Sequence, residues 1–495
     1  MAKINQIKDN IVTIQGKEKF RLFQNFQLNK NTTGFVLSAS GDEAKVLVNG
    51  STTELKMGSE VSAIAEKAIE VRSSYFGKII TPSGEVVHAS EESEEKDEVL
   101  GKSKLFNPAP SIIDRKGIDS PLDTGILAID TMIPIGRGQR ELIIGDRVTG
   151  KTNIALNAII NSHKSIKTIY VAIGQKKTNV IQAYEILRKH KAHKDTIIIY
   201  ANPDSASEQF LAPMIGSAMA EGLAYQGEDV LVIFDDLTKH ANVYREISLS
   251  IDRNPGREAY PNDIFYIHSR LLERGGKFNE TLNNGSITML PVVETVESDI
   301  ASLIPSNIIS ITDGQIFTNT EKFNKGEFPA IDIQMSVSRT GSVAQSNVIK
   351  FASKGIKADH SRYEEIRKFS EMSIDISDEL SNQIKQSKQL DKILQQYGNV
   401  GYSREVMVML IFLYKSGVME GDFTMRDFAT VVSYYFDKNP VGKALKKQLS
   451  NVTSENEKQI KTYAEKVGKE LVDALNGKYG KAFSKEEITK MKGAK

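Results

Sequence analysis

Residues 145 to 152 constrain this chain more than any other part of its sequence, because they follow the pattern G-x-x-x-x-G-K-[ST]. In order, they are Gly145, Asp146, Arg147, Val148, Thr149, Gly150, Lys151 and Thr152. In such a run the glycines let consecutive backbone N–H groups turn inward and cradle phosphate oxygens. The lysine reaches the β- and γ-phosphates, and the threonine hydroxyl is a magnesium ligand. The run therefore predicts a phosphate-binding loop.

The segments around this loop indicate a parallel α/β domain over about residues 105–353. Apolar stretches with the sequences ELIIG, TIYVAIG, TIIIYA and DVLVIFDD alternate with segments of helical period such as NIALNAIINSH. Strands that are apolar throughout and alternate with helices are typical of a sheet buried on both faces. The last stretch ends in two aspartates, and an aspartate at such a strand end can hold Mg²⁺ through its hydration shell. We expect Asp235 to do so, and Asp236 to cap the next helix.

The regions on either side differ in pattern. Residues 1–87 contain short apolar or alternating stretches separated by Gly, Asn and Asp, which predicts a small β-barrel or sandwich. Residues 88–104 are acidic and carry little apolar surface, so a solvated loop or linker is expected there. Residues 354–495 follow a helical period with apolar residues on one face, which predicts a helical C-terminal domain.

Composition excludes several classes of protein. The 495 residues include 64 Lys+Arg and 63 Asp+Glu, a formal net charge of +1, which argues against a protein that coats nucleic acid or anionic lipid. The absence of cysteine excludes disulfides and thiol catalysis. No apolar run is long enough to span a bilayer, and no apolar signal core is seen, so we expect a cytoplasmic protein. The H-x-x-H pair His190 and His193 lies among lysines and lacks a third ligand, which disfavours a metal site.

Several long runs in the central region closely resemble the α subunit of F-type ATP synthases. They are GQRELIIGDR (138–147), GREAYPNDIFYIHSRLLER (256–274), LPVVET (290–295), IPSNIISITDGQIF (304–317) and SVSRTGS (336–342). The resemblance is dense from about residue 114 to residue 351. It implies three domains: a β-barrel, a RecA-like nucleotide-binding domain and a helical bundle.

The resemblance also implies ligands and partners. The nucleotide would be ATP or ADP with Mg²⁺. Three such subunits would alternate with three catalytic β-type subunits around a central γ-type rotor, with stalk chains or unfamiliar motor chains attached. The complex would lie at the inner face of the cell membrane.

Two residues gain roles from the resemblance. Catalytic subunits of the family carry a glutamate where Gln175 stands here, and that carboxylate orients and polarises the attacking water. A carboxamide cannot act as that base, so the chain is expected to hold nucleotide without turning it over. Arg339, in SVSRTGS, matches the family's arginine finger, which would reach the catalytic site of a neighbouring subunit.

Departures from the family pattern concentrate where the base of the nucleotide would bind. Val148 replaces the usual glutamine of the phosphate loop, and Phe328 replaces the arginine before the pocket proline, here Pro329. The usual Gln-Gly-Gln run before a Tyr-Ser pair is Asn399-Val400-Gly401 here. Several polar contacts to the base and phosphates are therefore lost or changed.

Three alternatives stay open beside the ordinary synthase subunit. One is an α-like subunit of a specialised F-type-like motor without proton translocation, as in the gliding-associated ATPases of mollicutes. A second is a self-sufficient homohexameric export-type ATPase, which would need a glutamate at Gln175. A third is a nucleic-acid translocase, which would want a basic, aromatic N-terminal domain that the acidic run argues against.

Overall fold

The computed structural model describes ten stretches of the chain. They are residues 2–17, 19–50, 52–89, 97–370, 378–399, 401–419, 421, 423–453, 455–478 and 483–492. The chain divides into two compact units. The first comprises residues 1–117, 137–144 and 163–313, and the second comprises residues 118–136, 145–162 and 314–495.

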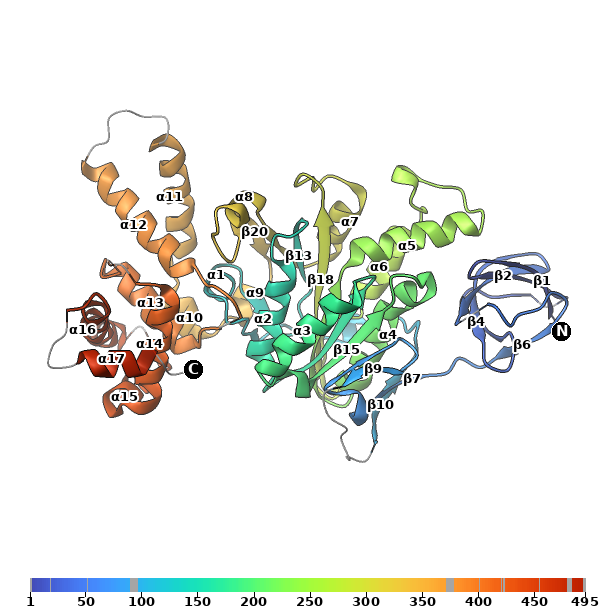
Figure 1. The fold of residues 1–495 in the computed structure, drawn as a ribbon, viewed down its shortest axis with the longest axis horizontal. Helices are drawn as coiled ribbons and strands as arrows, with labels where there is room; N and C mark the ends of the chain where they lie inside the picture. The colour runs from blue at the N-terminus through green and yellow to red at the C-terminus, as the bar shows by residue number, and fades with distance from the viewer. Residues whose placement is uncertain are drawn as a thin grey trace. The chain divides into compact units, whose positions relative to one another are not determined.

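Six short strands at the start of the first unit form a closed barrel, drawn in blue in Figure 1. They are β1 (Ala2–Lys8), β2 (Ile11–Gln15), β3 (Asn25–Gln27), β4 (Thr33–Ser40), β5 (Glu43–Asn49) and β6 (Glu60–Ile64). The order around the barrel is β1-β2-β5-β4-β3-β6, and antiparallel pairing of β1 with β6 closes it. Val12, Ile14 and Val46 are fully buried inside. The alternative of an open sandwich is therefore excluded, and the barrel implied by the resemblance is confirmed.

The chain after β6 leaves the barrel earlier than the sequence suggested. β7 (Ile69–Arg72) pairs with β10 (Val99–Ser103), and β8 (Lys78–Ile80) pairs with β9 (Val86–Ala89) and with a strand of the central sheet. Strand β10 and the end of β9 lie within residues 88–104, where a loop was expected. These segments form strands because they pair with partners distant in the sequence, and local composition does not indicate such pairing. Residues 90–96 of the acidic run lie outside the described residues.

The central sheet of the first unit is mostly parallel. Its strands are ordered β13-β18-β16-β14-β15-β8-β9. The bounds are β13 (Glu141–Asp146), β14 (Lys167–Ile173), β15 (Thr196–Ala201), β16 (Asp229–Asp235) and β18 (Ser286–Thr295), with the short β17 (Gly276–Lys277) antiparallel to β18. The accompanying helices are α3 (Lys177–Lys189), α4 (Ala206–Ala224), α5 (Leu237–Ser250), α6 (Ile264–Leu272) and α7 (Leu303–Ile311). The predicted parallel α/β domain is confirmed.

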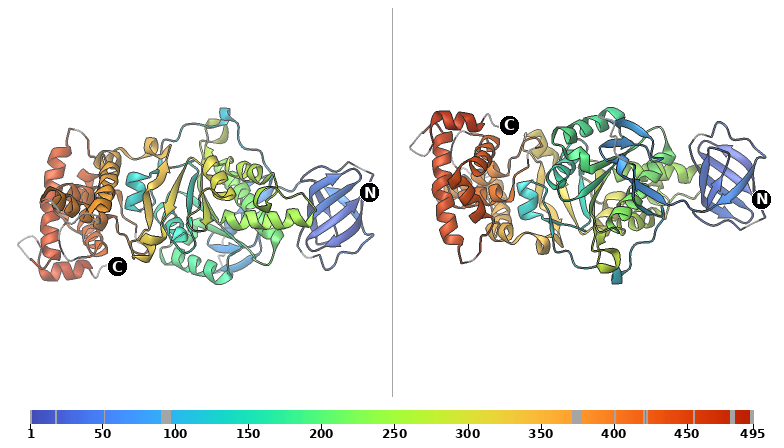
Figure 2. Two further views of the ribbon diagram at one scale, coloured as in Figure 1. Left: turned by 90° about the horizontal axis from the view of Figure 1, so that it is seen from above. Right: turned by 90° about the horizontal axis from the view of Figure 1, so that it is seen from below.

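The second unit begins with the elements around the phosphate loop. They are β11 (Pro121–Leu122), α1 (Leu127–Met132), β12 (Ile135–Gly136), α2 (Lys151–Ser162), β19 (Gly314–Thr318), α8 (Thr320–Asn324), β20 (Ile331–Ser338), α9 (Gly341–Ala344) and α10 (Asn347–Ala352). Strands β19 and β20 are antiparallel neighbours. The two further views in Figure 2 show these elements in yellow and cyan.

The rest of the second unit is helical, as predicted. Its helices are α11 (Ile356–Ser370), α12 (Asp378–Leu394), α13 (Arg404–Lys415), α14 (Met425–Lys438), α15 (Pro440–Leu449), α16 (Glu457–Leu475) and α17 (Lys485–Lys492). The apolar run from Val406 to Tyr414 forms the buried middle of α13, which α16 packs against. Among the described residues, no helix has both the length and the apolar character that a bilayer crossing needs.

Candidate nucleotide-binding site

The phosphate loop joins the end of β13 to the start of α2, as the sequence predicts. Gly145 has φ of +154°, and a Cβ on it would lie 2.1 Å from Thr318 Oγ1 and 2.5 Å from the Thr318 carbonyl oxygen. Gly150 has φ of +88°, in the left-handed region that favours glycine. Both glycines of the motif are therefore required by the backbone itself: one by close approach of β19, the other by its dihedral angle.

Lys151 and Thr149 hold the inside of the loop. The Lys151 side chain is only 6% exposed, and its Nζ donates to the carbonyl oxygens of Gly145 and Asp146, at 2.9 and 2.5 Å. Thr149 Oγ1 donates to the Asp146 carbonyl oxygen at 2.8 Å and lies 2.6 Å from Thr318 Oγ1. The loop therefore wraps around a buried ammonium group, and this charge and shape fit a phosphate.

The outer side of the loop is strained and exposed. Val148 has φ of +62° although it is β-branched, and it is 72% exposed. Such a conformation is an outlier that persists only where the surroundings impose it, typically at a functional site. Arg147 beside it is also exposed. Thr152, in the first turn of α2, is partly buried, and its hydroxyl is the side-chain group of this helix start that suits a magnesium ion.

A pocket of about 240 Å³ adjoins the phosphate loop within the second unit. Its lining comes from the loop and α2, from the chain between β19 and β20, and from the segment after α12: Thr149, Gly150, Asn153, Ile154, Asn157, Phe323, Phe328, Pro329, Ala330, Gln396, Tyr397 and Gly398. The Phe328 ring makes edge contacts with the rings of Phe323 and Tyr397, at centroid distances of 5.1 and 5.8 Å. A pocket with aromatic walls beside a phosphate loop suits the base of a nucleotide.

The structure places the four predicted base-pocket residues differently from one another. Phe328 and Pro329 line the pocket. Gly401 packs on α2, where a Cβ would come within 1.9 Å of Asn161 Oδ1, and it does not belong to the lining. Asn399 is partly buried outside the lining, and Val400 lies outside the described residues. Contacts of Asn399 and Gly401 with nucleotide stay predictions.

The residues that sequence reasoning missed are Asn153 and Asn157 on α2, Phe323, and the run from Gln396 to Gly398. The asparagines carried a usable signal, since they recur four residues apart between apolar residues of one helix and so share a face. The Gln396 side chain is used in the fold: its Nε2 donates to the Gly125 carbonyl oxygen, and its Oε1 accepts from the Leu127 N–H. No local pattern indicates that this segment reaches the loop.

In the first unit, the ends of β14 and β16 bring Gln175 and Asp235 together. The register places Ala172 opposite Asp235, and Gln175 Nε2 donates to the Asp235 carbonyl oxygen at 3.0 Å. The Asp235 carboxylate accepts from Tyr170 Oη at 2.7 Å, and it is 4% exposed. Burial and this neighbouring carboxylate raise the pKa of Tyr170, so its hydroxyl stays a donor. The amide and the carboxylate are thus held at one edge of the sheet.

Asp236 caps α5, which confirms the prediction for this residue. Its Oδ1 accepts from the Lys239 N–H at 2.8 Å. Burial raises the pKa of the Asp236 carboxyl to about 7, an effect that Lys239 only partly offsets. Asp235 is thus the last residue of β16, and Asp236 is the N-cap of α5.

Arg339 follows β20 directly and precedes α9. It is exposed to solvent, in contrast to the buried Lys151 of the loop. An exposed guanidinium on a strand end can reach a group outside its own chain, and its planar fork of donors suits phosphate oxygens.

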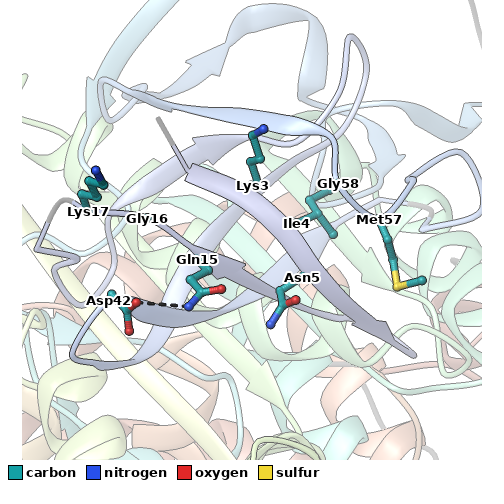
Figure 3. Close-up of a pocket in the computed structure, with 9 residues that line it drawn as sticks. All are labelled: Lys3, Ile4, Asn5, Gln15, Gly16, Lys17, Asp42, Met57 and Gly58. Carbon is teal, nitrogen blue, oxygen red and sulfur yellow. Dashed lines mark hydrogen bonds between the residues drawn. The ribbon is translucent and has the colours of Figure 1, made fainter.

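Two further features lie away from this site. A hollow of about 610 Å³ on the barrel, shown in Figure 3, is lined by polar and charged side chains together with Ile4 and Met57, and in it Gln15 Nε2 donates to Asp42. In Figure 3 the charged residues of this described lining, Lys3, Lys17 and Asp42, lie apart and do not converge on a common ligand position. Among the described residues, His360, Glu364 and Asp391 place ligand atoms within 4.8 Å of one another, which the sequence pattern did not indicate.

Comparison with known proteins gives consistent matches over most of the chain. A family profile described as "ATP synthase alpha/beta family, nucleotide-binding domain" matches residues 125–338, and one described as "ATP synthase alpha/beta chain, C terminal domain" matches residues 345–477. The protein named "ATP synthase subunit alpha 2" of Mycoplasmopsis pulmonis (strain UAB CTIP) is 42% identical over 446 residues, which cover 89% of this chain and 86% of that protein. The "ATP synthase subunit alpha" of Vesicomyosocius okutanii subsp. Calyptogena okutanii (strain HA) is 38% identical over 492 residues, 96% of this chain and 93% of that protein.

Proposed function

Because the chain belongs to the ATP synthase alpha/beta family, we propose that it is an alpha-type subunit that holds magnesium nucleotide without hydrolysing it. Gln175 carries this proposal. It stands where catalytic subunits of the family carry a glutamate, and its Nε2 donates to the Asp235 carbonyl oxygen. A carboxamide cannot take a proton from water at neutral pH, so this chain lacks the base that hydrolysis needs at that position.

The phosphate loop supports the binding half of the proposal. Its backbone N–H groups and the Lys151 ammonium would hold the β- and γ-phosphates, and the Thr152 hydroxyl would ligate the magnesium ion. Bound magnesium neutralises phosphate charge. In the first unit, Asp235 is the carboxylate proposed to face the ion's hydration shell. Nucleotide held in this way stabilises the fold, because ligand that binds only the folded state shifts the unfolding equilibrium.

The proposal gives Arg339 a role outside its own chain. Three copies would alternate with three catalytic β-type subunits around a γ-type rotor, on the membrane periphery. Arg339 would then stabilise the charge that develops on the phosphoryl group in the neighbouring catalytic site. Its exposure at the end of β20 supports this role.

The test is the Arg339→Lys variant in the assembled complex. A lysine keeps the charge but loses the planar fork of donors, so we expect the steady-state ATPase rate to fall by about 10³-fold. Nucleotide that co-purifies with this chain should be unchanged. The matched control is Arg426→Lys, an exposed arginine on α14, which should leave the rate within twofold of wild type. An unchanged rate for Arg339→Lys would contradict the assignment.

A second candidate is an alpha-type subunit of a specialised motor that does not move protons. Two observations favour it: the aromatic lining that includes Phe328 in place of the family's arginine, and the similarity to the relative named "ATP synthase subunit alpha 2". Inverted membrane vesicles that carry the complex distinguish the two. Acidification of their lumen on addition of ATP supports the synthase role, whereas ATP hydrolysis without acidification supports the motor.

A further inference from the structure

His360 is a buried imidazole on α11 that faces a carboxylate of the same helix. It is 3% exposed, and its Nε2 lies 3.8 Å from Oε1 of Glu364, four residues further on. Residues four apart share one face of a helix. Asp391, on the neighbouring helix α12, completes the group, because ligand atoms of the three residues all lie within 4.8 Å of one another. Two helices thus bring one imidazole and two carboxylates together.

The charges of this group favour a bound cation. The Glu364 and Asp391 carboxylates are both partly buried, and like charges at this separation repel each other. Partly or fully buried carboxylates are commonly stabilised by a counter-charge or by a metal ion. A divalent cation between the two would offset their repulsion, and the imidazole would supply a third ligand.

A cavity of about 120 Å³ borders His360 and Asp391. A water molecule needs only about 10–15 Å³ of such space, so the cavity has room for an ion's water ligand. The other charged groups of its described lining are Glu327 and Lys322, and Lys322 Nζ donates to the Ile331 carbonyl oxygen at 3.3 Å. Carboxylates therefore outnumber ammonium groups around the cavity, which favours a cation over an anion.

The donor atoms indicate which cation fits. Mg²⁺ and Ca²⁺ prefer oxygen ligands, whereas an imidazole nitrogen suits Zn²⁺ and its neighbours among the transition metals. The chain has no cysteine, so imidazole and carboxylate are its side chains suited to Zn²⁺. Ligand atoms on a tetrahedral Zn²⁺ lie about 3.4 Å apart, given bond lengths of about 2.0–2.2 Å. The 3.8 Å between His360 and Glu364 is close to this value, and rotations of the partly exposed carboxylate side chains can close the rest.

We propose that His360, Glu364 and Asp391 bind one divalent transition-metal ion, with Zn²⁺ the best fit. The three side chains supply three ligands, and a water molecule in the adjoining cavity supplies the fourth. The ion links α11 to α12, and it is distinct from the magnesium that accompanies the nucleotide. This site does not depend on the proposed function, because none of its residues belongs to the phosphate loop.

The experiment titrates Zn²⁺ into the full-length chain without nucleotide, by calorimetry, with Mg²⁺ in excess to fill sites made of oxygen alone. For wild type we expect one Zn²⁺ per chain with a dissociation constant of about 1 μM or lower. Zn²⁺ should also raise the Tm, and a chelator should reverse this rise. For Glu364→Gln, Asp391→Asn and His360→Gln we expect the affinity to fall by at least about tenfold, since each variant loses one ligand.

Matched variants show whether the effect belongs to this site. Glu365→Gln makes the same change at the exposed neighbour of Glu364, and it should keep wild-type affinity. His190→Gln removes an imidazole of the H-x-x-H pair and should also keep it. If the buried His360→Gln does not fold, the two carboxylate variants still decide the result. Absence of Zn²⁺ binding by wild type, wild-type affinity in Glu364→Gln and Asp391→Asn, or loss of binding in His190→Gln would overturn the inference.

Discussion

Gly145 lies where no other residue fits, because a Cβ there would come within 2.1 Å of one Thr318 atom and 2.5 Å of the strand's carbonyl oxygen. Gly145→Ala must therefore push β19 away from the phosphate loop. We expect the affinity for ATP, measured by calorimetry, to fall by at least about 100-fold, since a displacement near 1 Å is enough to spoil a positioned site.

Gly117→Ala is the matched control for this change. A Cβ at Gly117 meets no atom within 4 Å, and its φ lies outside the left-handed region. Wild-type affinity is expected for it. Tight ATP binding by Gly145→Ala would contradict the close approach of β19 to the phosphate loop.

At the residue scale, sequence patterns are most informative where the chemistry depends on neighbours along the chain. The phosphate loop needs glycines, a lysine and a threonine at fixed spacing along the chain, so the sequence pattern by itself predicts the loop. The helix cap at Asp236 is equally local, and the structure confirms it. Phe323 and Tyr397 could not be found in this way, because only the packing of distant segments brings them to one pocket.

At the scale of elements, a buried ion pair ties α4 to the chain that follows α6. Arg274 Nε and Nη2 donate to the two oxygens of Glu221 at 2.7 and 2.8 Å, and the side chains are 1% and 0% exposed. Ser103, at the end of β10, also donates to this carboxylate. One carboxylate thus connects a helix, a loop and a strand.

Arg274→Met removes one partner and leaves the Glu221 carboxylate buried without its counter-charge. The expected loss in the free energy of unfolding is about 3–5 kcal/mol, measured by urea denaturation. The control is Arg188→Met on α3, whose pair with Glu185 is half exposed and should matter by less than about 1 kcal/mol. Equal effects of the two substitutions would show that burial of the pair is unimportant.

Two buried histidines join α5 to α6 and give the first unit a pH dependence. His240 Nδ1 lies 3.2 Å from His268 Nε2. Burial lowers the pKa of His240 from 6.5 to about 4, and that of His268 well below 6.5. In the unfolded chain these two histidines therefore become protonated near pH 6.5, whereas in the folded chain they stay neutral at that pH. The free energy of unfolding is therefore unaffected by the two histidines above pH 6.5, and they lower it progressively as the pH falls towards 4.

The size of this effect can be measured by urea unfolding between pH 7.5 and pH 4.5. Each histidine contributes a slope of about 1.4 kcal/mol per pH unit below pH 6.5. His240→Met, which cannot titrate, should show a shallower decline than wild type, and other titrating groups cancel in the comparison. Parallel curves for the two proteins would rule out His240 as a source of the dependence.

For the whole molecule, the sequence predicted the fold type of each region better than the boundaries between regions. Alternating apolar strands and helical periods were sufficient for the barrel, the parallel sheet and the helical region. Strand β8 was not assigned to the central sheet, because its parallel pairing with β15 joins residues more than a hundred positions apart. Local patterns indicate which residues can form a strand, but pairing with residues far along the chain determines which sheet the strand joins.

The central claim is that this chain holds nucleotide and leaves catalysis to a different subunit. Affinity purification of the native protein, with mass-spectrometric identification and counting of the co-purifying chains, tests it most directly. We predict equal numbers of this chain and of a distinct β-type subunit, with ATPase activity in the complex and none in this chain alone. Recovery of this chain by itself as an active homohexamer would contradict the claim.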